Sequence, residues 1–119
     1  MAAVNIVNVT SINGFNLAGA VTTSATDVID VPADVIYKIN TILIANVDGT
    51  NAADITIDMS RDNGSNYFNL ASTISVPADS TLNFLSTTLY LDETDLLRLT
   101  ASANSDLHYV ISGEILGDA

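Results

Sequence analysis

Acidic residues between two Asx-Gly pairs are the part of this chain that most resembles a chemical site. The pairs are Asp48-Gly49 and Asn63-Gly64, and Asp54, Asp58 and Asp62 lie between them. A helix–loop–helix calcium loop needs glycine at its sixth position, a spacing that neither pair provides. Asp54 and Asp58 share one strand face, but their Cα atoms would lie about 13 Å apart. We therefore interpret these acids as turn and strand-face residues, with a calcium site formed by converging turns as the alternative.

His108 is the second candidate, because it is the only histidine in a chain without cysteine. One histidine without cysteines cannot build a typical zinc site. As a general base it would need a nucleophile, and no G-x-S-x-G elbow supplies one. Glu114 shares its strand face but lies about 20 Å away along an extended strand. We expect His108 to be an exposed or interface residue.

The acids at Asp92, Glu93 and Asp95 are the third candidate, because glycoside hydrolysis needs two carboxylates across a cleft. They belong to a turn, and the chain has no tryptophan to stack on a sugar. The chain has no Walker loop and no G-x-G-x-x-G motif. We therefore predict no catalytic residues, no metal ligands, no cofactor and no enzymatic activity.

The charge balance limits the partners of the chain. The net charge is −11, and the only basic residues are Lys38, Arg61 and Arg98. Nucleic acids and anionic membranes are bound through clustered lysine and arginine, so we expect neither as a partner. The N-terminus lacks a signal-peptide pattern, and no apolar run is long enough to predict a transmembrane helix.

The elements that must position these residues are predicted to be strands. Asparagine, serine and threonine are abundant, whereas glutamate and lysine, which favour surface helices, are scarce. Apolar alternation and turn signals recur about every ten residues. This spacing predicts an all-β single domain, a β-sandwich or jelly roll of about eight short, mainly antiparallel strands. The clearest expected strands are 27–31, 35–47, 54–60, 67–76, 81–86, 89–91, 96–102 and 106–116.

The stretch from Ala45 to Leu70 is predicted to form a three-stranded meander. Its Asx-Gly pairs would supply the positive φ angles of tight turns. Ile55, Ile57 and Met59 would form the buried face of the middle strand. In the following strand, Phe68, Leu70 and Ile74 would share one face.

The tetrapeptide Val-Pro-Ala-Asp occurs twice, at 31–34 and 76–79, each time before an expected strand. Proline cannot donate to a sheet ladder, and aspartate favours turns. The repeat therefore indicates a turn used twice at the edges of the fold.

The first 26 residues contain no charged side chain. We divide the chain into residues 1–26, an uncharged arm or the first strands, and a sandwich domain at 27–119. The segment either packs within its own domain or lies on a neighbouring subunit. For the second case, the predicted partner interface consists of Val4, Ile6, Val9, Ile12, Phe15 and Leu17.

Between about residues 36 and 115, the sequence resembles the small virion structural proteins of tailed bacteriophages, particularly those of marine cyanobacteria. The resemblance rests on the sequence segments NVDGTNAADI and STISVPADSTL and on the acidic YLDETD corner before LRLTASANSDL. They are not catalytic motifs, so they transfer no site residue. The resemblance implies a non-enzymatic part of a phage particle.

The resemblance favours a capsid decoration or cement protein, a class of small β-rich and often trimeric modules on the outer shell. Its partners would be the major capsid protein or other virion subunits, and a homo-oligomer, with a trimer favoured. A neck, tail or fibre component is the first alternative. A carbohydrate- or receptor-binding β-sandwich module is the second.

Overall fold

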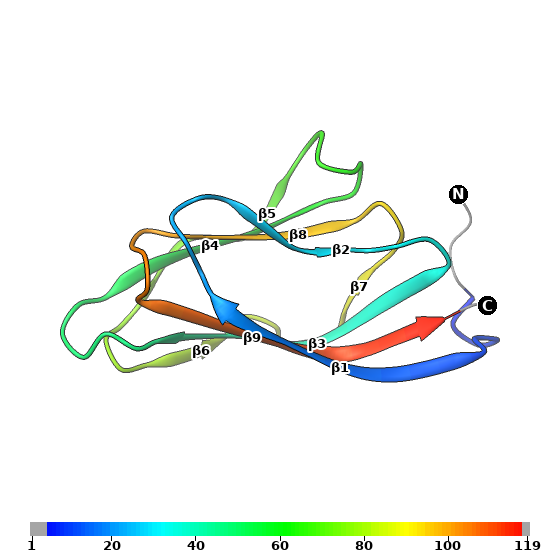
Figure 1. The fold of residues 1–119 in the computed structure, drawn as a ribbon, viewed down its shortest axis with the longest axis horizontal. Helices are drawn as coiled ribbons and strands as arrows, with labels where there is room; N and C mark the ends of the chain where they lie inside the picture. Colours follow the sequence, from blue (N-terminus) through cyan, green and yellow to red (C-terminus); the bar gives the residue numbers. More distant parts are fainter. Residues whose placement is uncertain (1–4, 118–119) are drawn as a thin grey trace.

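The computed structural model describes residues 5–117, which form nine strands and no helix. The strands form two antiparallel sheets, so the prediction of an all-β sandwich is confirmed (Figure 1). In chain order, the strands are β1 (Ser11–Ala20), β2 (Thr26–Asp30), β3 (Val35–Asn46), β4 (Ala53–Ser60), β5 (Phe68–Val76), β6 (Thr81–Asn83), β7 (Leu89–Leu91), β8 (Leu96–Ala101) and β9 (Leu107–Gly117).

The two sheets divide the chain between them. The first sheet has the order β1-β9-β3-β6, and β7 also pairs with β3. The second sheet has the order β2-β8-β4-β5. The predicted meander is therefore wrong, because β3 and β4 lie in different sheets and residues 47–52 cross between them. A short polar turn has the same kind of sequence whether it connects two paired strands of one sheet or two strands of different sheets.

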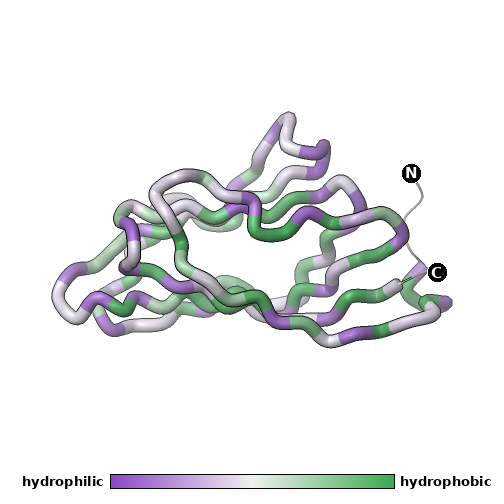
Figure 2. Tube along the Cα trace, viewed as in Figure 1, coloured by the Kyte–Doolittle hydropathy of each residue, from purple (hydrophilic) through white to green (hydrophobic). Residues whose placement is uncertain are grey.

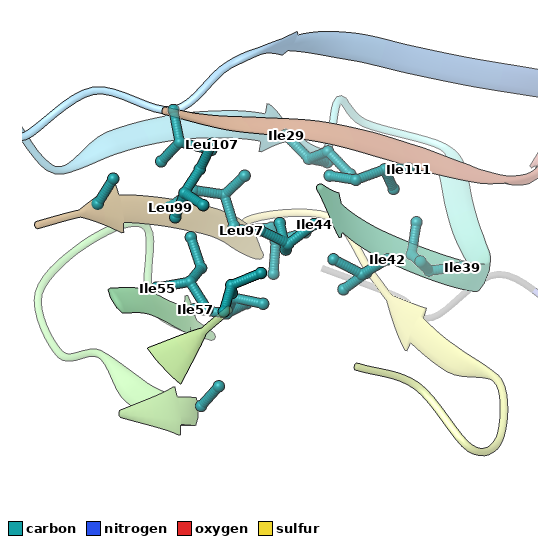
Figure 3. Close-up of a cluster of buried hydrophobic side chains, with 14 of the residues drawn as sticks. Ile29, Ile39, Ile42, Ile44, Ile55, Ile57, Leu97, Leu99, Leu107 and Ile111 are labelled. Carbon is teal, nitrogen blue, oxygen red and sulfur yellow. The ribbon is translucent and has the colours of Figure 1, made fainter. Parts of the chain in front are cut away.

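The core lies between the facing sheets. Figure 3 shows isoleucine and leucine side chains from both sheets pointing toward one another. Ile42 and Ile44 of β3 oppose Ile55 and Ile57 of β4, and all four are 0% exposed. Burying one such side chain stabilises the fold by roughly 1.5–3 kcal/mol. Figure 2 shows hydrophobic and hydrophilic residues alternating along many strands, as a two-layer sandwich requires.

A bulge in β3 changes which side chains face the core. The pairing with β9 skips Asn40, since Ile39 pairs with Gly113 and Thr41 with Ser112. The core-facing position therefore moves from odd to even numbering, and Ile39, Ile42 and Ile44 are all fully buried. The shift therefore lets Ile39 and the even-numbered Ile42 and Ile44 enter the same core.

The β4–β5 hairpin closes as its Asn-Gly pair predicts, with φ values of 58° at Asn63 and 96° at Gly64. The prediction is wrong for Asp48-Gly49, because Gly64 is the only glycine with a positive φ among residues 5–117. The chain turns there through hydrogen bonds of the Asp48 side chain, which are described below.

Both Val-Pro-Ala-Asp segments form a similar turn. Asp34 and Asp79 adopt left-handed backbone conformations, with φ values of 66° and 56°. The valine at the start of each segment is buried, with exposures of 4% for Val31 and 0% for Val76. Each segment thus ends a strand in the core and directs the chain into the next, as the repeat predicts.

The N-terminal strand belongs to the first sheet. All ten residues of β1 pair with β9 of the same chain, from Ser11 with Gly117 to Ala20 with His108. The boundary predicted between residues 26 and 27 falls inside β2. The division of the chain at that point remains a prediction.

Candidate interaction surfaces

The carboxylate of Asp62 organises the turn between β4 and β5. It accepts hydrogen bonds from the Asn66 side chain at 2.7 Å, the Asn66 amide at 2.9 Å and the Ser60 hydroxyl at 2.8 Å. These bonds, those from Asn66 first, lower the pKa of Asp62 from 3.8 to about 2. The negative charge of Asp62 is therefore used to hold its own turn.

Asp48 holds the crossing between β3 and β4 in the same way. Its Oδ1 accepts hydrogen bonds from the amides of Thr50, at 2.8 Å, and Asn51, at 3.2 Å. The bond from Thr50 contributes most to lowering the pKa of Asp48. Among residues 5–117, no three histidine or acidic side chains lie together as a metal site would require.

The Asp62 turn predicts a specific acid sensitivity. Because the folded-state pKa of Asp62 is below its ordinary value, its stabilisation is present above about pH 4 and is lost as the pH falls toward 2. We expect Asp62→Asn to be less stable than wild type at pH 7 and to lose less stability between pH 4 and 2. Thermal midpoints at pH 7, 4, 3 and 2 measure the difference.

Asp54→Asn is the matched control, because it removes the same charge from a half-buried strand position. It should follow the wild-type pH profile. Parallel profiles for wild type and Asp62→Asn would contradict a stabilising role of the Asp62 charge.

Asp58 is not the solvated acid that its strand pattern predicts, because the residue is only 5% exposed. Arg98 of the neighbouring β8 donates to both of its carboxylate oxygens, at 2.9 and 2.7 Å. The Tyr67 ring covers the guanidinium, whose carbon lies 3.5 Å from the ring centroid. The Tyr67 hydroxyl donates to Asp27 at 2.9 Å. Desolvation, followed by this bond to Asp27, raises the pKa of Tyr67. Each charge in this cluster has a protein partner, so the arrangement is structural.

His108 is exposed and pairs with Ala20 on one side and Ala45 on the other. It lines a shallow hollow together with Ala18, Gly19, Ala20, Tyr109 and Val110. The residues around His108 in this hollow include no acid that could orient its imidazole. The hollow therefore offers a surface for contact.

The residues predicted as a partner interface are Val4, Ile6, Val9, Ile12, Phe15 and Leu17, and those that the structure describes differ in exposure. Ile6 and Ile12 are 46% and 60% exposed, and Val9 is half-buried. Phe15 and Leu17 are half-buried and pack against the core of their own chain. Val4 lies outside the described residues. The interface role of the set remains a prediction.

A second apolar surface lies on β5, where Phe68, Leu70 and Ile74 are 66%, 40% and 42% exposed. We call these three side chains the β5 patch. β5 is an edge strand with two register shifts against β4, and Thr73 has a φ of 46°. The prediction that Phe68, Leu70 and Ile74 share one regular strand face is wrong, because Ala71 and not Leu70 pairs with Ile57, and Leu70 lies at a register shift. The sequence contains no signal for this exposure, because it depends on the position of the strand within the sheet.

The solved structures that are similar to this chain include the following two. A Bacillus endospore appendage protein, from a family of disulfide-linked pili, is 13% identical, with a TM-score of 0.55 over 92% of this chain and 88% of that chain. A pentameric capsid protein from metagenomic phage sequences is 16% identical, with a TM-score of 0.40 over 88% of this chain and 60% of that chain. The first similarity shows a shared fold. No protein-family model and no curated protein sequence matches the chain. No helix within residues 5–117 is long and apolar enough to span a membrane.

Proposed function

We propose that the chain is a non-enzymatic structural protein of a phage virion, a decoration protein that binds the outer capsid shell and bridges its subunits. The observation that carries the proposal is a small β-sandwich whose β5 patch exposes an aromatic and two aliphatic side chains on one edge strand. Exposed apolar side chains grouped on one element are typical of contact surfaces. The resemblance over residues 36–115 supports the phage particle as the place of that contact.

The charge of the chain supports an outer position. A net charge of −11 would repel packaged DNA if the protein lay on the inside of a shell. On the outside the same charge keeps the free protein soluble before it binds the shell. Binding through the β5 patch would then depend on apolar burial, which salt does not weaken.

The proposal is tested first by counting copies in purified particles. A shell protein is expected at hundreds of copies per virion, measured by quantitative mass spectrometry against the major capsid protein. Six, twelve or a few dozen copies would instead indicate the neck, tail or fibre. Absence from the particle would contradict the proposal and leave the carbohydrate- or receptor-binding alternative.

The β5 patch gives the same proposal a residue-level test. Phe68→Ser is expected to weaken binding to undecorated capsids at least about tenfold, since an aromatic anchor contributes roughly 2 kcal/mol at an interface. The thermal midpoint of the free protein should change little, because Phe68 is 66% exposed. Cosedimentation over a range of protein concentrations measures the binding.

Val47→Ser is the matched control for this test, because Val47 is 51% exposed in the crossing between the sheets. It removes an exposed apolar side chain from elsewhere on the surface and should leave capsid binding unchanged. Equal losses for both variants would show that the β5 patch is not the contact surface.

The shared fold makes a self-assembling appendage subunit the second candidate. The similar structure belongs to disulfide-linked pili, whereas this chain contains no cysteine and cannot form such a link. Filaments of the purified protein under the electron microscope would favour this candidate over a shell protein.

A further inference from the structure

The outer edge of β1 is open. β1 pairs with β9 on one side, and no other strand within residues 5–117 pairs with it. The pairing runs through all ten residues without a register shift, so the strand is regular over its whole length. Figure 1 shows β1, in blue, beside β9 at the margin of its sheet.

The hydrogen-bond pattern identifies the backbone groups at this edge. The Val21 amide donates to the Leu107 carbonyl at 2.8 Å, directly beyond the end of β1. Because antiparallel partners bond at alternate residues, the odd-numbered residues of β1 bond to β9. The even-numbered residues therefore direct their amides and carbonyls outward: Ile12, Gly14, Asn16, Ala18 and Ala20.

The other three sheet edges carry features that prevent strand addition. β2 is five residues long and includes Asp27 and Asp30. β5 is interrupted by two register shifts, and β6 and β7 are three residues each. β1 has none of these features, because it contains no charge, no proline and no bulge.

We propose that the open edge of β1 pairs with β1 of a second copy of this chain, antiparallel and around a twofold axis. The charge distribution favours a second copy of this chain as the partner of the β1 edge. Each copy carries a net charge of −11, yet residues 1–26 contain no charged side chain. Contact through β1 therefore brings two acidic copies together without placing acids against each other, whereas β2 would oppose aspartates.

The twofold pairing satisfies the open edge of both copies. Each outward amide of one β1 meets an outward carbonyl of the other, since both strands present even-numbered residues. The axis passes near the middle of the strand, so Asn16 lies close to Asn16 of the second copy. On the core-facing side, the half-buried Phe15 and Leu17 of one copy lie near those of the other. The two first sheets join into one continuous sheet.

This inference rests on the proposed function and specifies its homo-oligomer. The resemblance implies a trimer, whereas pairing between two β1 strands forms a twofold dimer. Its test uses the isolated protein in solution. Self-association can therefore fail while capsid binding succeeds, and the reverse result is equally distinguishable.

Sedimentation velocity of the full chain tests the pairing. We expect a species of twice the 12.5 kDa mass of one chain, with a dissociation constant of about 10–100 µM, as for other small interfaces. Raising the salt concentration should tighten the dimer, because it screens repulsion between the acidic copies. A protein that remains monomeric at about 500 µM, or forms trimers, overturns the proposal.

Ala18→Pro probes the edge itself. It removes an amide that faces outward, so the bonds between β1 and β9 should persist and the thermal midpoint should change little. The dimer dissociation constant is expected to rise at least about tenfold, because each dimer loses two hydrogen bonds. Ala18→Ser keeps the amide and should dimerise like wild type. An unchanged dimer in Ala18→Pro overturns the proposal.

A charge pair at Asn16 tests the twofold geometry and does not depend on the proline variant. Asn16→Glu and Asn16→Lys each place like charges across the axis and should weaken self-association about fivefold. An equimolar mixture should restore a dimer at least as strong as wild type, which misfolded variants cannot do. Failure of the mixture to recover dimerisation overturns the antiparallel pairing.

Discussion

Replacing Gly113 with alanine is expected to destabilise the fold by about 3 kcal/mol, the upper end of the losses caused by strain at a constrained backbone position. A Cβ atom at this position would overlap the carbonyl oxygen of Lys38 and would lie 3.1 Å from the Cα atom of Ile39. Both atoms are backbone atoms of β3, so neither can move without shifting the strand. Chemical denaturation followed by circular dichroism measures the loss.

The bulge at Asn40 explains why β3 and β9 approach so closely here. Gly113 pairs with Ile39 immediately before the register shift, where the bulged strand bends. β9 lies between β1 and β3, so displacing it at this point disturbs two ladders of the first sheet.

Gly14→Ala is the matched control for this substitution. The nearest atom to a Cβ at Gly14 is the Gly113 carbonyl oxygen at 4.0 Å, an ordinary contact. The control is expected to change stability by less than about 0.5 kcal/mol, as surface substitutions do. If Gly113→Ala costs no more than Gly14→Ala, the close approach of the two backbones is not a constraint on the fold.

The fold class follows from local properties that the sequence contains. Asparagine and threonine-rich strands with regular turns can bury an apolar face only by pairing into sheets. The Asn63-Gly64 turn and the two Val-Pro-Ala-Asp turns are set by residues within the turn itself, and each was predictable. In these turns, the residues that determine the backbone conformation are the same residues from which the turn is predicted.

The assignment of strands to sheets depends on distant parts of the chain, and this explains the failed meander. β3 and β4 are consecutive in sequence, but their ladders are formed with β9 and β8, far along the chain. Likewise, Asp58 alternates as a polar strand residue, but Arg98 and Tyr67 cover it only in the folded sheet. A turn can be predicted from the residues that form it. A contact between a residue and a strand forty residues away cannot be predicted from the residue itself.

One of the candidate contact surfaces could be predicted from the sequence, and the other could not. The uncharged N-terminal segment is a property of sequence, and the open edge of β1 lies within it. The β5 patch was not predictable, because Phe68, Leu70 and Ile74 alternate like core residues. They are exposed on a strand that lies at the sheet edge and has two register shifts.

Replacing Arg98 with methionine is expected to cost about 3 kcal/mol, because it leaves the buried Asp58 carboxylate without its charged partner. The Asp58 side chain is 8% exposed, and Arg98 supplies both of its short hydrogen bonds. The Arg98 side chain is 29% exposed, so water can partly replace the guanidinium. This access places the expected cost at the lower end of the range for broken buried pairs.

The double variant Asp58→Leu/Arg98→Met distinguishes the free energy contributed by the ion pair from the cost of leaving Asp58 buried and unpaired. Removing both charged groups leaves no buried carboxylate, so the double variant should be more stable than Arg98→Met alone. Arg98→Lys keeps the charge but loses the two-pronged geometry and the flat contact with Tyr67, and it should cost about 1 kcal/mol. Free energies of unfolding for wild type, Asp58→Leu, Arg98→Met and Asp58→Leu/Arg98→Met complete a thermodynamic cycle. If the double variant is no more stable than Arg98→Met, the cost arises from lost packing over Tyr67 and not from the uncompensated charge of Asp58.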